Sequence, residues 1–225
     1  MPMLEVLVLC EARADFEIAT HLVRRVVEER DSLPVPLEDA LRWRGVVPGA
    51  LFTEVKYFQK DCRSAGLKFR KYQGFTRGVP QKSAAAEARK VVLVADQLRK
   101  KEAEQVAILF VRDLDSAPDR LEGMEQARGE ARAGGIEMIL ATPDPKRETW
   151  VLAGFVARSP EEERRLKRKR DVKKIVERLT GGDGDREKKC WEVTPLELLE
   201  DRGRANRLAE YLQEVEERLL PLLTR

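Results

Sequence analysis

The stretch Val106-Ala-Ile-Leu-Phe-Val-Arg-Asp-Leu-Asp-Ser116 decides the fold class of this 225-residue chain. Its first six residues are apolar without interruption, a pattern typical of a strand buried on both faces of a parallel sheet. Asp113 and Asp115 follow that strand directly. Open α/β sheets bind their ligands just outside the carboxyl ends of the strands. The stretch therefore predicts an α/β fold with acidic side chains at its functional edge.

A second apolar run, Leu4–Cys10, is followed by Glu11 and Asp15. If both strands are central and parallel, their acids meet at one edge of the sheet, and Glu148 reaches the same edge from a third predicted strand at 136–141. Carboxylates this close do not all stay ionised without a counter-cation. A hard divalent metal with oxygen ligands is the simplest such cation. Taken singly, the acids also suit ordinary structural roles, as a helix N-cap or as turn residues.

The middle of the chain alternates strand and helix patterns, which predicts a central, mostly parallel sheet of about four strands flanked by helices. Only helical patterns follow residue 158. We therefore expect an α/β domain over residues 1–157 and a C-terminal helical extension over 158–225 that packs on it. The same patterns predict a short helix near 37–43, a strand near 67–72 and one charged helix over 160–179.

Composition limits the class of protein without naming a partner. The 43 Lys and Arg residues nearly balance the 40 Asp and Glu residues, and a net charge of +3 does not by itself imply a nucleic-acid partner. Three widely spaced cysteines indicate neither a zinc site nor a disulfide framework. No apolar run approaches the ~20 residues that span a bilayer, and no signal-peptide pattern precedes the first strand. We expect a cytoplasmic protein without a membrane partner.

The acidic motifs resemble those of a known family. Glu11-Ala-Arg-Ala-Asp15 after a strand, followed about a hundred residues later by Asp113-Leu-Asp115 after another, resembles the TOPRIM domain. The segment Thr142–Phe155, TPDPKRETWVLAGF, resembles the Glu-x-Trp-Leu-Leu element of TOPRIM proteins related to the OLD (overcoming lysogenization defect) nucleases of bacterial defence loci. The resemblance covers residues 3–157. Ala12 and Ala14 depart from it, since the family usually has a glycine and a small polar residue there.

This resemblance implies a TOPRIM/Rossmann-like sheet and a Mg²⁺-dependent (or Mn²⁺-dependent) endonuclease, a hydrolase of nucleic acid, with DNA favoured over RNA. It implies an ATPase partner subunit and a role in antiviral defence, and a homo-oligomer is compatible with it. The implied metal ligands are Glu11, Asp15, Asp113, Asp115 and Glu148. The implied catalytic residues are Glu11, Asp113, Asp115 and Lys146. The alternative is a non-catalytic, TOPRIM-like interaction subunit of such a complex.

Basic residues give the candidate substrate contacts. The stretch from Lys68 to Arg77 mixes cations, aromatic residues and glycine, a composition that suits a loop gripping a nucleic-acid backbone and equally suits a solvated strand and turn. The expected nucleic-acid-binding residues are Lys68, Arg70, Lys71, Arg77 and Arg147. A denser basic run over 164–170 is either a solvated helix face or a phosphate-contacting one. His21, the single histidine, falls in the middle of a predicted helix, so we expect metal-bound water to be the nucleophile.

Overall fold

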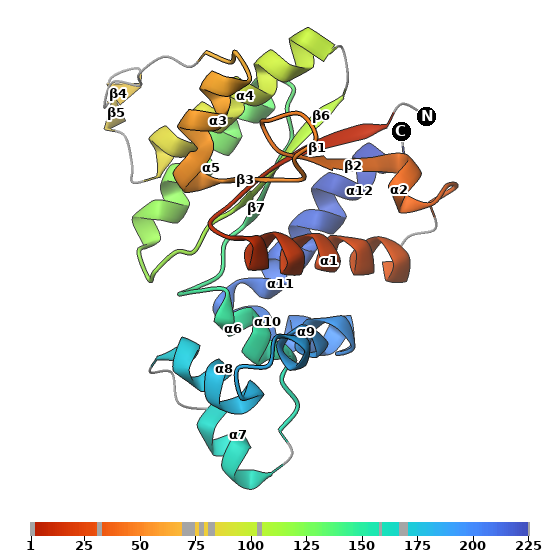
Figure 1. The fold of residues 1–225 in the computed structure, drawn as a ribbon, viewed down its shortest axis with the longest axis vertical. Coiled ribbons are helices and arrows are strands. Elements are labelled where there is room, and N and C mark those ends of the chain that lie inside the picture. The colour runs from red at the N-terminus through yellow and green to blue at the C-terminus, as the bar shows by residue number, and fades with distance from the viewer. Residues whose placement is uncertain are drawn as a thin grey trace.

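The computed structural model describes residues 3–30, 33–68, 75–76, 79–80, 84–102, 105–157, 159–166 and 171–224. It is an α/β fold in which a parallel sheet lies between helices, with a further group of helices below the sheet in the view of Figure 1. The predicted fold class is confirmed. None of the helices within these ranges has the length and apolarity needed to cross a membrane.

Five strands form the central sheet of the described residues, in the order β2-β1-β6-β7, with β3 also pairing with β1. Their bounds are β1 Leu4–Cys10, β2 Leu41–Arg44, β3 Thr53–Glu54, β6 Val106–Val111 and β7 Met138–Ala141. Each of their pairings is parallel. The carboxyl ends of β1, β6 and β7 therefore share one edge of the sheet. Two short strands, β4 Phe75–Thr76 and β5 Val79–Pro80, form a separate antiparallel pair.

The side chains of the central strands alternate between two apolar cores, as a side-chain period of two requires. In β1, Val6 and Val8 belong to one core, whereas Leu7 and Leu9 belong to the other. The second core contains the helices α3 Phe58–Ser64, α4 Ala85–Glu102 and α5 Pro118–Ala133. The first core contains α1 Arg13–Arg30, α11 Leu208–Glu214, a π-helical turn at Val215–Leu219 and α12 Leu220–Leu223. Both faces of the sheet are thus covered, which explains why β6 and β7 are uninterrupted apolar runs and why β1 is apolar except for Glu5.

The helices below the sheet follow β7 (Figure 1). They are α6 Glu148–Gly154, α7 Pro160–Leu166, α8 Val172–Thr180, α9 Gly184–Glu192 and α10 Leu196–Gly203. The chain then returns to the sheet. The Tyr211 hydroxyl donates to the Ala19 carbonyl at 2.9 Å, and the Glu214 carboxylate accepts the backbone N–H of Leu140 on β7 at 3.1 Å. The C-terminal helices therefore share one apolar core with residues before 157, across the predicted boundary.

Two local predictions differ from the structure, and a third lies mostly outside the described residues. The helix predicted near 37–43 covers only α2, Leu37–Ala40, because the next residues form β2 beside β1. The buried Glu5 of β1 stabilises this pairing through ion pairs with Arg42 and Arg44. The helix predicted over 160–179 is described as two helices, with Asp171 in a left-handed conformation capping the second. The strand predicted at 67–72 lies outside the described residues except for 67–68, which are not in a strand.

Candidate active site

The structure brings four of the five predicted ligands together at the carboxyl edge of the sheet. Glu11 follows β1, Asp113 follows β6, and Glu148 begins α6 after β7. Asp15 lies in the first turn of α1, the helix that β1 leads into. Glu11, Asp15 and Glu148 each act electrostatically on the carboxyl of Asp113. Parallel strands with acids at their ends therefore produce the convergence that the sequence predicted.

Asp113 is held by the loop that follows β7. Backbone N–H groups of Leu114 and Asp115 donate to the carbonyls of Pro143 and Pro145, both at 2.9 Å, so the two loops run side by side beyond the strands. This alignment lets the backbone N–H of Arg147 donate to Asp113 Oδ1 at 3.0 Å. The pKa of Asp113 is raised to about 7. Burial is the largest cause, and the charges of the surrounding carboxylates are the next.

Asp15 combines a structural role with membership of the acidic group. Its Oδ2 accepts the backbone N–H of Ala12 at 2.8 Å, the reciprocal half of a capping box at the start of α1. The side chain is buried, and this burial raises its pKa, while the Ala12 hydrogen bond and the Arg147 cation oppose the shift. An N-cap role was open to Asp15 from the sequence. In the structure Asp15 is the third residue of α1, and Ala12 stands at the cap.

Trp150 fixes the position of α6, and with it that of Glu148. Its ring is fully buried and stacks on Tyr211 of α11 with ring centroids 5.0 Å apart. Its indole N–H donates to the carbonyl of Asn206 at 2.9 Å, and the Asn206 amide donates to the Thr149 carbonyl at 2.9 Å. The tryptophan of the Glu-Thr-Trp segment is therefore a packing residue that orients the start of α6.

The Arg147 guanidinium is the cation within this acidic group. Its Nε lies 3.5 Å from Asp15 Oδ1, and its Nη2 lies 3.6 Å from Glu148 Oε1. Its Nη1 donates to Glu187 of α9, and only 15% of the side chain is exposed. The sequence predicted a nucleic-acid contact for Arg147, whereas in the structure it neutralises carboxylates inside the protein. Glu187 had no sequence signal, because it lies forty residues further along the chain in a charged helix.

Arg112 is a second site residue that the sequence analysis missed. Its Nη1 lies 3.2 Å from Glu11 Oε1, and its Nε lies 3.6 Å from Glu87 Oε2 of α4. It thereby ties the end of β1 to the helix layer on the second core. The signal was present, since Arg112 stands between the last residue of β6 and Asp113. Arginines 112 and 147 thus flank the acidic group with positive charge.

Asp115 lies apart from the other four acids. Its backbone is left-handed, with φ of 50°, and its Oδ2 accepts from Arg120 Nη1 at 2.6 Å. Lys146 Nζ lies 3.6 Å from Asp115 Oδ1, and both side chains are exposed. The charge of Asp115 is not among the causes that raise the pKa of Asp113. The structure therefore pairs the predicted ligand Asp115 with the predicted catalytic Lys146 at the rim of the site.

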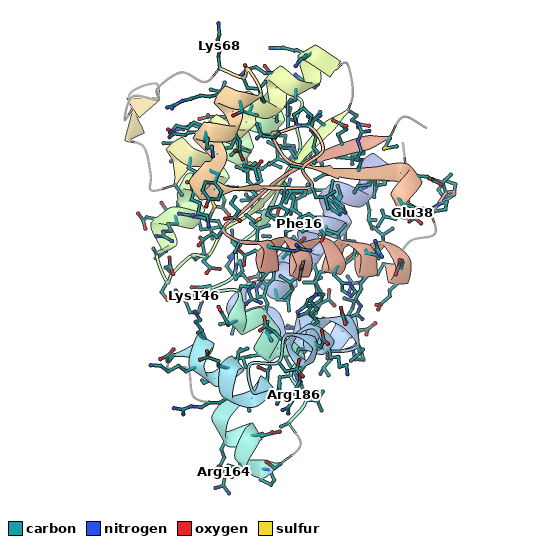
Figure 2. All side chains as sticks on the ribbon, viewed as in Figure 1. Phe16, Glu38, Lys68, Lys146, Arg164 and Arg186 are labelled. Carbon is teal, nitrogen blue, oxygen red and sulfur yellow. The ribbon has the colours of Figure 1, made fainter. Side chains whose placement is uncertain are left out.

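Of the predicted substrate contacts that the structure describes, Arg147 lies at this edge and Lys68 does not. Lys68 lies at the far end of the molecule from Lys146 (Figure 2). Its backbone exchanges hydrogen bonds with the side chain of Gln97, late in α4, where that helix approaches the amino end of β6. Arg70, Lys71 and Arg77 lie outside the described residues, as does the 167–170 part of the second basic run.

The donors at the site are carboxylate oxygens, which are the ligands that Mg²⁺ prefers. Within the described parts of the chain, however, no three His, Cys, Asp or Glu side chains are placed to hold one metal ion. Arg147 supplies positive charge in their midst instead. The residue types suit a hard divalent cation, but the described side chains are not arranged around one point, and the Arg147 guanidinium contacts two of them, Asp15 and Glu148.

Comparison with known proteins returns no match to a family model, a curated protein or a solved structure. The resemblance to TOPRIM and OLD-like proteins therefore rests on the motifs Glu11–Asp15, Asp113–Asp115 and Thr142–Phe155 alone.

Proposed function

We propose that this chain is a Mg²⁺-dependent nuclease that hydrolyses nucleic-acid phosphodiesters at the carboxyl edge of its sheet. The observation that carries the proposal is the convergence of Glu11, Asp15 and Glu148 on the partly buried Asp113, whose pKa they help raise to about 7. Such mutual repulsion is costly to a fold, and it is typical of sites that bind a cation or move protons. The motif resemblance supports the same reading.

Glu11 and Asp113 would hold the metal, and Asp15 and Glu148 would join them only on leaving their contacts with Arg147. A bound Mg²⁺ polarises a phosphate and lowers the pKa of its water. Arg112 orients Glu11 through their 3.2 Å contact, and the Arg147 backbone orients Asp113. Arg112 directly follows β6, and Arg147 directly precedes α6.

Lys146 is the cation best placed to meet a phosphate from solvent. About half of its side chain is exposed, and its contact with Asp115 is long, at 3.6 Å. A phosphate can therefore compete for the ammonium group at little cost, because exposed ion pairs contribute ~0–1 kcal/mol. Arg147 is less exposed and is bonded to Glu187. Its positive charge therefore stays in place and lowers the repulsion among the carboxylates.

The test is Asp113→Asn, assayed for Mg²⁺-dependent cleavage of single- and double-stranded DNA and RNA and for Mg²⁺ binding by calorimetry. We expect loss of cleavage and weaker metal binding, with the fold retained by circular dichroism. Asp201→Asn, which removes a carboxylate that is 74% exposed on α10, is the matched control and should leave both unchanged. Cleavage by the Asp113→Asn protein at the wild-type rate would refute the proposal.

The second candidate is a non-catalytic interaction subunit. The internal neutralisation of Asp15 and Glu148 by Arg147 favours it, since a site that carries its own cation has less need of a metal. Wild-type protein that binds no Mg²⁺ or Mn²⁺ at millimolar concentration would select this candidate. The resemblance implies an ATPase partner and a defence role for either candidate function. The corresponding test measures whether this chain binds an ATPase encoded beside it.

A further inference from the structure

We propose that a groove between α1, β2 and α9 binds a nucleobase of the strand whose phosphate lies at the carboxylate site. This inference rests on the proposed function and names a subsite for its substrate. The groove has a volume of about 330 Å³, at the lower end of the ~300–1,000 Å³ range of ligand pockets. The helices α1 and α9 that form two of its sides contact each other (Figure 1).

Four aromatic rings from three elements line the groove. They belong to Phe16 and His21 of α1, Trp43 of β2 and Trp191 of α9. His21 and Trp191 meet edge to face, with ring centroids 4.9 Å apart and planes at 66°. Aromatic faces bind unstacked bases with little regard to sequence, because every base has a π-face. The groove thus brings aromatic rings of two helices and a strand to one place, where a base can meet them.

Two polar ring atoms in this lining lack a partner. Nε2 of His21 and Nε1 of Trp191 are both buried without a hydrogen bond, and Trp191 is only 5% exposed. A buried polar atom without a hydrogen bond destabilises the protein, so a ligand that supplies the missing bond is favoured. Burial lowers the pKa of His21, which leaves its imidazole neutral at pH 7 and above. A nucleobase edge carries the donors and acceptors that these two atoms lack.

The charges around the groove favour the neutral part of a nucleotide. Arg24 and Lys188 balance Glu17 and Glu192, and Lys188 Nζ lies 3.2 Å from Glu17 Oε2. A groove with balanced charge does not concentrate phosphate, whereas its carboxylates can accept hydrogen bonds from exocyclic amino groups. The base therefore belongs in the groove, and its phosphates belong at the neighbouring site or on the two cations at the rim.

The groove begins where the carboxylate site ends. Phe16 and Glu17 of its lining follow Asp15 directly, and Lys188 follows Glu187, the partner of Arg147. Helices α1 and α9 therefore contribute residues to the groove and to the carboxylate site. Figure 2 labels one residue on each helix, Phe16 on α1 and Arg186 on α9. Trp43 is in register with Val6, several residues before the end of β1, so a strand that presents one phosphate to Asp113 would place a base further along the same strand in the groove.

The experiment measures binding of adenosine 5′-monophosphate and of a short single-stranded DNA to the full chain, by calorimetry and tryptophan fluorescence. An Asp113→Asn background prevents cleavage. His21→Ala and, separately, Trp43→Leu should each weaken binding about tenfold or more, the loss expected when one base-stacking contact is removed. Tyr57→Ala, at an aromatic residue that is 49% exposed outside the groove, is the control and should bind normally. Melting temperatures verify that each variant is folded.

Failure of this inference is distinguishable from failure of the proposed function. Wild-type affinity in both groove variants, or no binding of either probe by the parent protein, would overturn the base subsite. Binding that depends on His21 and Trp43 in a protein without metal-dependent cleavage would retain the subsite and refute the nuclease.

Discussion

Asparagine at position 113 should make this protein more stable at neutral and alkaline pH. The substitution removes one charge from the carboxylate group and keeps an oxygen where the Arg147 backbone N–H donates at 3.0 Å. The native state of the wild type binds more protons than the unfolded state between pH 3.8 and about 7, because the pKa of Asp113 is raised. The free energy of unfolding therefore falls as pH rises through that window.

The magnitude follows from the same pKa. A carboxyl whose pKa rises from 3.8 to about 7 loses roughly 4 kcal/mol of folding free energy across the window, at about 1.4 kcal/mol per pH unit. Solvent at the open edge of the sheet screens part of this loss. We expect Asp113→Asn to exceed the wild type by roughly 2–4 kcal/mol at pH 8 and to approach it near pH 4.

The assay is urea unfolding of both proteins between pH 4 and pH 8 in the presence of EDTA. Asp201→Asn, at the exposed carboxylate on α10, should run parallel to the wild type throughout. A difference between Asp113→Asn and the wild type that does not change with pH would show that the pKa of Asp113 is not raised in the folded protein. A wild type that is more stable than Asp113→Asn at pH 8 would show that its charge is already neutralised.

Three further outcomes test the site and its supports. Arg147→Met should lower the free energy of unfolding of the metal-free protein, measured in urea, by about 3–5 kcal/mol, because it leaves buried carboxylates unpaired. The control Arg13→Met, in an exposed pair, should change that free energy by less than about 0.5 kcal/mol. Trp150→Ala should cost about 3–5 kcal/mol, since it empties a fully buried ring site, and a cost under about 1 kcal/mol would remove its supporting role. Millimolar Mg²⁺ should raise the melting temperature of the wild type, with about 2.7 kcal/mol gained at a hundredfold excess over Kd, and an equal rise in Asp113→Asn would place the metal elsewhere.

The strands that position the site were predictable because their signal is local. Val106–Val111 is an uninterrupted apolar run and Leu4–Cys10 is apolar except for Glu5, and the structure makes both of them strands with those bounds. Strand β2 was not predictable in the same way. Its residues, Leu-Arg-Trp-Arg, form a strand because β1 offers a parallel partner and because the buried Glu5 pairs with two of its arginines.

The sequence by itself determined which acids reach the edge, since chain order places Glu11 and Asp113 at the ends of central strands and parallel pairing then brings those ends together. Only the tertiary structure decided how their charge is balanced. Arg147 bonds to Glu187, which is 40 positions away, and contacts Asp15, which is 132 positions away. Both contacts form once α9 packs against α1 and α6. Ion pairs depend on distances of a few ångströms between separate elements, and no local pattern in a sequence encodes such distances.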